Sequence, residues 1–395
     1  MKDFLKTMLA VICGVIVLKA LRVFLFIIFF GVALASVGSS IPRHGVLDLD
    51  FSQFAITEQT QEGTPELSAA FSSSMVPDIG LQDAVNAVKY AADDPAVSYI
   101  LLRAEGAVAG ISDFEELRAA LSEFHDSGKA IIAYMENPGN GSYYLSSVAD
   151  KIYMGSQHGG NNMLIGLSAQ LQYLKDILDK VGVKMQLIRH GKYKSAGETY
   201  IRSSASPENR EQYQVLLNSV WGSVSDGITA SRDFTREQLD ALMDNLALNF
   251  PEDFLAAGLV DELVDHETLL TRLCTAAQVE DAGKLVLISF NDYVSDRIGT
   301  VMPGRNNVAV IYADGEIVDG DDFRNVAGDR FVKVIDQVRR DRSIKSVVLR
   351  VNSPGGSVAA SVKIRTALDE LMKEKPLVAS YGNYAASGNG FALFL

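Results

Sequence analysis

The feature that most constrains the fold of this chain is an internal repeat. Residues in its first half recur 247 positions later, as Asp94 does in Asp341 and Arg103 in Arg350. The other matching pairs, aligned without a gap, are Leu102 and Leu349, Arg118 and Arg365, Ala120 and Ala367, Leu121 and Leu368, Glu123 and Glu370, Tyr134 and Tyr381, and Gly141 and Gly388. A repeat of this kind predicts two copies of one structural unit rather than two unrelated domains.

Both copies show the same order of predicted elements. An amphipathic helix, at residues 81–92 in the first copy and 331–340 in the second, leads into a continuous apolar run, YILLR or SVVLRV. A loop, a second helix at residues 113–124 or 358–372, and another apolar run follow. Continuous apolar runs suit strands covered on both faces, and their alternation with helices indicates βαβ units and a parallel sheet. We therefore expect two tandem α/β modules.

The chain has 395 residues, more than the roughly 100–200 of a typical domain. We expect a membrane anchor at residues 1–40, a first module at 41–293, a linker at 294–305 and a second module at 306–395. Within the first module, Ser206-Pro207 and the capping box from Thr235 to Gln238 predict two helix starts. The second module stops shortly after Ser387, so we expect it to be incomplete at its C-terminus.

The N-terminus carries two apolar runs, residues 7–18 and 23–37, interrupted by Lys19 and Arg22. The whole stretch is long enough for a helix across a hydrocarbon core of about 30 Å. Basic residues precede or interrupt it, so this side is expected to stay cytoplasmic and the rest of the chain to lie outside. The alternative is a cleaved signal peptide, because Ala-Leu-Ala at 33–35 resembles a cleavage site.

Charge and cysteine content exclude several classes of function. The chain has 36 basic and 49 acidic residues, a net charge of −13, and no cluster of Lys and Arg that would bind nucleic acid. Its two cysteines, Cys13 and Cys274, form no disulfide framework. The sequence supports no metal site, and we expect no cofactor.

Two segments of the second module combine the features of a serine nucleophile and an oxyanion hole. The turn at residues 352–357 follows a predicted buried strand and precedes a helix, so Gly355 and Gly356 can present backbone N–H groups. Ser387 lies among small residues after the next strand, where the N–H of Gly388 can face the same point. The alternatives are an ordinary turn and close packing at a helix start.

The candidate general base is a lysine. The five histidines, none in a setting that suggests a triad, are His44, His125, His158, His190 and His266. Lys194 lies in the turn-like stretch GKYKSA, residues 191–196, for which the alternative is a solvated basic loop. A lysine base near neutral pH needs a pKa about 3 units below its usual ~10.4, which burial or a nearby cation can produce. This requirement predicts that Lys194 lies in a partly apolar groove.

GKYKSA, NSPGGSV followed by AASG, and YYLSSVADKIYM at residues 143–154 resemble the signal peptide peptidase A group, or protease IV, of the long duplicated type. The resemblance implies ClpP/crotonase-like modules in a bacterial enzyme of the cytoplasmic membrane that degrades signal peptides outside the cytoplasm. It implies Lys194 as base, Ser387 as nucleophile, and oxyanion donors from the Gly355/Gly356 loop and the Gly388 N–H. It also implies a bowl-shaped tetramer. The repeat places Asn140 where the second copy has Ser387, so one composite site per chain is expected.

Two other functions stay open on the sequence alone. A crotonase-type acyl-CoA enzyme would share the fold and an oxyanion hole but need neither Ser387 nor Lys194. A catalytically inactive scaffold is the second alternative, because the second module is expected to be incomplete.

Overall fold

The computed structural model describes residues 41–59, 76–298, 304 and 306–386, with four further positions between 19 and 24. Nearly all of the predicted membrane anchor, and Ser387 and Gly388, therefore lie outside the described residues. The chain divides into two compact units, Met1–Ile41 and Pro42–Leu395, and both larger sheets lie in the second. Within the described part of the chain, no helix combines the length and the apolar character needed to cross a membrane.

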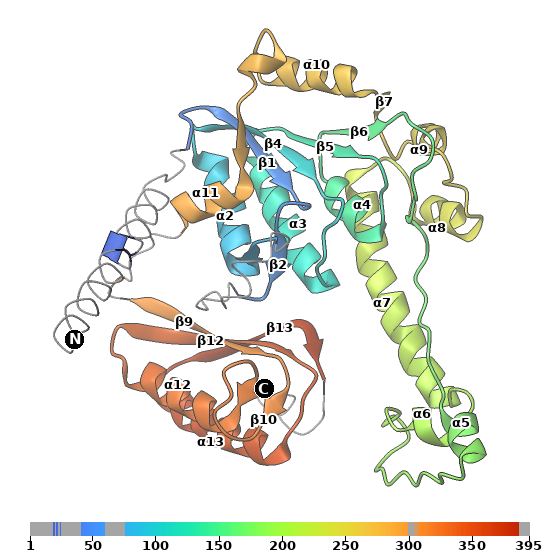
Figure 1. Ribbon diagram of the computed structural model, residues 1–395, viewed down its shortest axis with the longest axis vertical. Coiled ribbons are helices and arrows are strands. Elements are labelled where there is room, and N and C mark those ends of the chain that lie inside the picture. The colour runs from blue at the N-terminus through green and yellow to red at the C-terminus, as the bar shows by residue number, and fades with distance from the viewer. Residues whose placement is uncertain are drawn as a thin grey trace, which may run out of the picture. The chain divides into compact units, whose positions relative to one another are not determined.

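The larger sheet of the second unit has six parallel strands in the order β7-β6-β5-β4-β1-β8 (Figure 1). Their bounds are β1 Gly45–Asp50, β4 Val97–Arg103, β5 Ile131–Met135, β6 Lys151–Gly155, β7 Glu262–Val264 and β8 Leu287–Ser289. Tyr99 and Leu101 of β4 pack on one face of the sheet in a core that includes Leu273. Ile100 and Leu102 point to the opposite face and are fully buried. Burial on both faces explains the continuous apolar run in the sequence.

The other long elements that the structure describes up to residue 297 are helices. Their bounds are α2 Leu81–Asp93, α3 Ile111–Asp126, α4 Asn140–Ser146, α5 Lys175–Lys180, α6 Glu198–Ile201, α7 Pro207–Ser231, α8 Arg236–Asp244, α9 Pro251–Ala256, α10 His266–Ala276 and α11 Phe290–Arg297. The two predicted helix starts are confirmed. Ser206 caps α7, which has Pro207 in its first turn, and Thr235 forms a capping box with Gln238 at α8. Helix α11 extends into the residues predicted as a linker.

A second parallel sheet has the strand order β13-β12-β9. Its strands are β9 Asn307–Asp314, β12 Ile344–Ser353 and β13 Leu377–Ala385, and its helices are α12 Gly328–Arg340 and α13 Val358–Met372. Leu349 of β12, Ile335 of α12 and Leu368 of α13 are fully buried in one apolar core. Two short parallel pairs complete the fold: β2 Ala55–Thr57 with β3 Asp78–Gly80, and β10 Ile317–Val318 with β11 Val326–Ala327. The chain is thus α/β with parallel sheets.

Helices α2 and α12 end in the same way. Both bounds of α12 are those of α2 moved by 247 positions. The ammonium of Lys129 donates to the carbonyl oxygens of Ala91 and Asp94, both at 2.7 Å. Lys375 makes the corresponding two bonds at the end of α12, to Val338 and Asp341, both at 2.5 Å. The same polar contact therefore closes both helices.

The strand register corrects one detail of the repeat. Ile131 lies opposite Ile100 in the larger sheet, and Leu377 lies opposite Val347 in the smaller one. Ile100 and Val347 are 247 positions apart, but Ile131 and Leu377 are 246 apart. The prediction of an alignment without a gap is therefore wrong before β13, because helix α13 has 15 residues where α3 has 16. The equivalence of Asn140 and Ser387, which assumed a constant offset, stays a prediction.

Candidate functional site

The glycine turn after β12 is shaped by a close backbone approach. Gly355 and Gly356 have φ angles of +96° and +151°, values that favour glycine. The Ile317 N–H of β10 donates to the Gly355 carbonyl at 2.8 Å, and the Ser357 N–H donates to the Ile317 carbonyl at 2.7 Å. A Cβ on Gly356 would lie only 2.0 Å from the Ile317 carbonyl oxygen. The position therefore requires glycine.

The turn leads directly into the N-terminus of α13. Ser357 is the N-cap, and its hydroxyl oxygen accepts from the Ala360 N–H at 3.2 Å. The Gly355 N–H donates to Ser353 Oγ at 3.1 Å, whereas the Gly356 N–H makes no hydrogen bond to any residue that the structure describes. An unpaired N–H beside a helix N-terminus can bind an oxyanion, because the helix dipole favours negative charge there. Of the two predicted donors, Gly356 is thus the available one.

The end of strand β13, which precedes Ser387 in the sequence, lies beside the start of the glycine turn. Ser353 and Ala385 are paired in the sheet, and the Ala386 N–H donates to the Ser353 carbonyl at 3.0 Å. Ala386 is the last described residue before Ser387. The described part of this segment therefore ends beside the glycine turn, as expected for neighbouring parallel strands that share one sheet edge.

Asn352 organises this edge, although the sequence reasoning gave it no role. Its Nδ2 donates to Asp314 Oδ1 of β9 at 2.8 Å, and its Oδ1 accepts from the Tyr384 N–H of β13 at 3.1 Å. One amide side chain thus joins the carboxyl ends of all three strands of the smaller sheet. Its place at the start of the NSPGGSV segment was the only signal in the sequence.

The loop that carries Lys194 is held against the start of α7. Arg189 Nη1 donates to the Lys194 carbonyl at 3.0 Å and to Glu198 Oε1 at 2.9 Å. Glu198 is fully buried and accepts from the Ser206 N–H and hydroxyl at 3.0 and 2.7 Å. Burial alone would raise the pKa of Glu198, but these hydrogen bonds lower it below its usual value. An ionised carboxylate therefore anchors the loop.

The Lys194 side chain itself is exposed. The prediction that it lies in a partly apolar groove is wrong for the single chain, because the surrounding segment has little buried surface. Helix α5 has no buried residue, and Ile188 leaves 91% of its surface exposed. The other large exposed apolar side chains of this segment are Ile177, Val181, Val183, Met185, Tyr193 and Tyr200. Lys194 thus belongs to a segment whose large apolar side chains are exposed in the described part of the chain.

The histidines, all of which are described, form no catalytic triad. His125 and His158 pair with Asp150 and Glu252 at 3.0 and 2.8 Å. His44 Nε2 lies 3.1 Å from Ser98 Oγ, but its Nδ1 faces the Pro95 carbonyl and no carboxylate orients the ring. No group of three or more described His, Cys, Asp or Glu residues is arranged to hold a metal ion.

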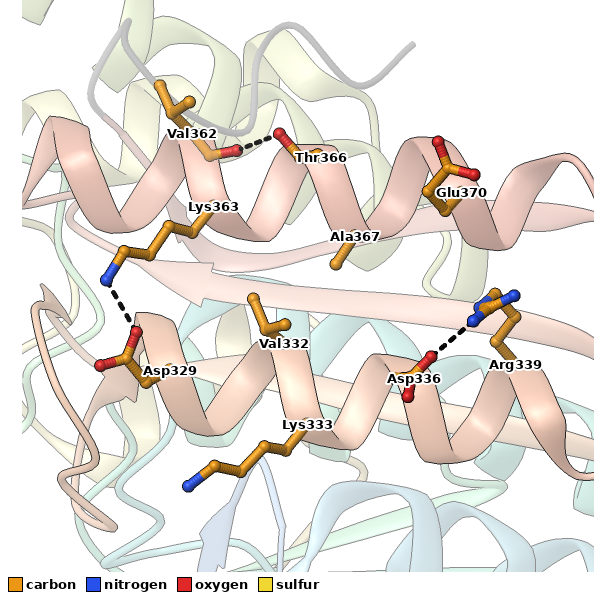
Figure 2. A pocket seen from close by; sticks show the side chains of 10 residues that line it. All are labelled: Asp329, Val332, Lys333, Asp336, Arg339, Val362, Lys363, Thr366, Ala367 and Glu370. Carbon is orange, nitrogen blue, oxygen red and sulfur yellow. Dashed lines mark hydrogen bonds and ion pairs between the residues drawn. The ribbon is translucent and has the colours of Figure 1, made fainter.

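A groove of about 620 Å³ lies on the surface of α12 and α13 (Figure 2). Val332, Val362 and Ala367 contribute apolar atoms to it, and Lys363 pairs with Asp329 at 2.7 Å at one end. Thr366 has the only hydroxyl among its lining residues and donates to the Val362 carbonyl of its own helix at 2.9 Å. This groove therefore lacks an activated nucleophile.

The sequence of the chain is similar to those of several known proteases. Residues 123–280 match the model of peptidase family S49. The chain is 34% identical over 355 residues to Protease 4 of Haemophilus influenzae, and the alignment covers 85% of this chain and 54% of that protein. It is 36% identical to Protease 4 of Salmonella typhi, in an alignment that covers 80% of this chain and 52% of that protein. It is 30% identical to Serine protease SPPA, chloroplastic, of Arabidopsis thaliana, in an alignment that covers 75% of this chain and 45% of that protein. The chain spans about half the length of these curated relatives.

Proposed function

We propose, from the premise that this chain belongs to peptidase family S49, that it is a membrane-anchored serine endopeptidase with Ser387 and Lys194 as its catalytic dyad. Its substrates are apolar peptides, in particular signal peptides left after secretion. Its fold comprises two tandem ClpP/crotonase-like modules after an N-terminal membrane helix. Its catalytic part lies on the extracytoplasmic side of the bacterial cytoplasmic membrane.

One observation carries the proposed chemistry. The segment leading to Ser387 is bonded through Ala386 to Ser353, at the start of the turn that contains the unpaired Gly356 N–H. We therefore expect a nucleophile that follows Ala386 and a donor at Gly356 to reach one substrate carbonyl. This is the arrangement that acyl transfer to a serine requires.

The reaction then follows from the roles of these groups. Neutral Lys194 removes the proton from Ser387 Oγ as this oxygen attacks the scissile carbonyl carbon. The N–H groups of Gly356 and Gly388 stabilise the negative charge that develops on the carbonyl oxygen. The protonated lysine next transfers its proton to the leaving amine, which gives an acyl-enzyme and the first peptide product. Attack of water on the ester releases the second product and restores the serine.

Lys194 must lose its exposure to water to act as a base, because desolvation favours the neutral amine. The exposed apolar side chains of the same segment, including Ile188, Met185 and Tyr193, suit burial against another protein surface. We accordingly propose that the enzyme is a homo-oligomer, a tetramer by family resemblance, in which this surface is covered.

Substitution of the dyad tests the function. Ser387→Ala and Lys194→Ala are each expected to abolish hydrolysis of a fluorogenic apolar peptide by the intact protein, measured as kcat/KM. Lys192→Ala is the matched control, since Lys192 belongs to the same loop and only pairs with Glu208 at 3.5 Å. It should keep activity within about twofold of the wild type, as expected for an exposed ion pair. Activity that survives in Ser387→Ala or Lys194→Ala would contradict the dyad.

A further inference from the structure

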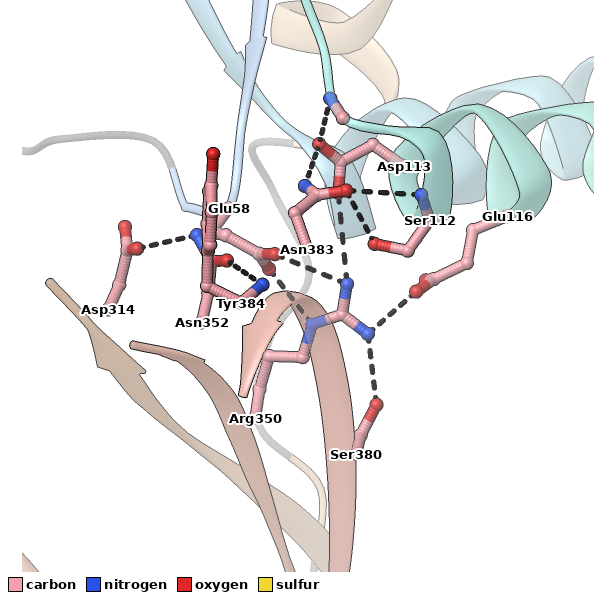
Figure 3. A network of polar contacts seen from close by, with 11 residues as sticks. Glu58, Ser112, Asp113, Glu116, Asp314, Arg350, Asn352, Ser380, Asn383 and Tyr384 are labelled. Atoms are coloured by element: carbon pink, nitrogen blue, oxygen red, sulfur yellow. Dashed lines mark hydrogen bonds and ion pairs between the residues drawn. The ribbon is translucent and has the colours of Figure 1, made fainter. Parts of the chain in front are cut away.

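Asn383 lies near the end of β13, four positions before Ser387, and its side chain contacts the first half of the chain (Figure 3). Its Oδ1 accepts from the Ser112 N–H at 3.1 Å and from the Ser112 hydroxyl at 2.8 Å. Its Nδ2 donates to Asp113 Oδ2 at 2.7 Å. Both ends of the amide are therefore bound by the first turn of α3.

The backbone of the first half is shaped around this amide. A Cβ on Gly110, the N-cap of α3, would lie 1.8 Å from Asn383 Oδ1. The Gly110 N–H donates to the same Asp113 Oδ2 at 3.1 Å, so the acceptor is also held in place. Because φ of Gly110 is −80°, alanine would suit this backbone, and only the close approach of Asn383 excludes a side chain.

The charged residues around the amide also come from both halves of the chain. Arg350 of β12 is buried and donates to Glu58 Oε2 at 2.9 Å, to Glu116 Oε1 at 2.6 Å and to Ser380 Oγ at 2.9 Å. Its Nη2 lies 3.9 Å from Asp113 Oδ1, a buried oxygen without a hydrogen bond among the described residues. The end of β13 is therefore docked on the first half through one continuous polar network.

Strand β13 needs such support. In the part of the smaller sheet that the structure describes, it pairs with β12 alone, and its residues are exposed or half-buried. Between Tyr381 and Ala385 the pairing with β12 is interrupted by an irregularity. An edge strand with an interrupted ladder opens readily at its end unless other contacts hold it.

We propose that Asn383 is a positioning residue through which Ser112 and Asp113 of the first half set the place of the Ser387 hydroxyl. This inference rests on the proposed role of Ser387 as nucleophile. A misplacement of about 1 Å at a reacting group can lower the rate by about 10²-fold. The first half would thus contribute to catalysis through α3 as well as through the lysine loop.

Exchanging the amide of Asn383 and the carboxylate of Asp113 tests whether Asn383 positions the nucleophile or only stabilises the fold. Asn383→Asp keeps the acceptor for Ser112 but opposes two carboxylates across the 2.7 Å contact with Asp113. We expect kcat to fall about 10- to 100-fold with KM changed less than about twofold. Adding Asp113→Asn returns an N–H donor to the contact but removes the acceptor of the Gly110 N–H, so the double variant should recover about a third of the wild-type kcat and not all of it. Asn86→Asp, an exposed amide on α2, is the matched control and should leave kcat unchanged.

The readouts are steady-state hydrolysis by the intact protein, the rate of labelling by a fluorophosphonate that modifies the nucleophile, and the thermal midpoint Tm. A fall in kcat and labelling that the double variant reverses, at similar Tm, supports positioning by Asn383. Wild-type kcat in Asn383→Asp, or a loss that tracks Tm or that Asp113→Asn does not repair, overturns it. Ser387→Ala, assayed in parallel, reports on the proposed function separately, because activity in that variant would refute the nucleophile whatever Asn383 does.

Discussion

Gly356 shows how one residue constrains the candidate site. Its φ of +151° and the 2.0 Å gap between a hypothetical Cβ and the Ile317 oxygen are separate obstacles to any side chain. The backbone conformation alone costs about 1–2 kcal/mol in an L-residue. The steric overlap adds to this, because the Ile317 carbonyl is itself held by the Ser357 N–H. The oxyanion turn therefore depends on the absence of a Cβ at this position.

A pair of alanine substitutions separates these two contributions. Gly320 also has a positive φ, +87°, but a Cβ there would meet nothing within 4 Å. We expect Gly320→Ala to lower the free energy of unfolding by about 1 kcal/mol and Gly356→Ala by at least about 2 kcal/mol more. Urea unfolding of both variants measures the difference. Equal losses would show that Ile317 does not constrain the turn.

At the scale of elements, a lysine ammonium binds carbonyl oxygens at the C-terminal end of one helix in each half of the chain. The last carbonyls of a helix lack intrahelical partners, and Lys129 and Lys375 each bind two of them at the ends of α2 and α12. Each lysine also lies two positions before the first residue of the apolar strand that follows, β5 or β13. The contact therefore ties the end of one helix to the start of a strand.

Removal of either ammonium should destabilise the protein. Lys129→Met and Lys375→Met keep most of the apolar stem but leave two carbonyls without their charged donor, at an expected loss of about 1.5–3 kcal/mol each. Lys345→Met is the control, since exposed Lys345 donates to a single carbonyl, that of Arg342, and should cost less than about 0.5 kcal/mol. Chemical denaturation compares the three. A loss at Lys345 as large as at the other two would indicate a general charge effect.

Local patterns predicted much of this architecture. Apolar runs between helices indicated parallel sheets, and Ser206 and Thr235 marked helix starts, because these signals arise from neighbours in sequence. The strands β2, β3, β10 and β11 have only two or three residues and therefore carry no periodicity. The exposure of Lys194 fits the alternative of a solvated basic loop and not the predicted groove, because composition does not show whether a segment folds back on its own chain. Asn383 and Ser112 are 271 positions apart, and no local pattern connects them.

At the scale of the whole molecule, Arg350 joins the two halves of the second unit. It lies 247 positions after Arg103, which pairs with Asp48 and Asp50 of its own half. Arg350 instead pairs with Glu58 and Glu116, which belong to the first half (Figure 3). Matching positions in the two halves thus make different contacts: Arg103 pairs within its own sheet, and Arg350 pairs with the other half of the chain.

Loss of Arg350 should therefore be costly. Arg350→Met leaves the carboxylates of Glu58 and Asp113 buried without their cation. Removing one partner of a buried ion pair lowers the free energy of unfolding by about 3–5 kcal/mol. Arg365→Met, at an exposed arginine that pairs with Asp369 at 3.8 Å within α13, should cost no more than about 0.5 kcal/mol. Urea unfolding at pH 7 gives both values.

The cost should also depend on pH in a defined direction. Burial raises the pKa of Glu58 above its usual value of 4.5, and the hydrogen bond from Arg350 opposes this rise. Without Arg350 the folded-state pKa of Glu58 must be higher still, so the variant binds a proton more tightly when folded than when unfolded. Its stability is then retained below about pH 4.5 and lost as pH rises through the raised folded pKa. We expect the deficit of Arg350→Met relative to wild type to be full at pH 7 and clearly smaller near pH 4.5. An equal deficit at both pH values would mean that lost packing, and not an uncompensated buried carboxylate, accounts for the destabilisation.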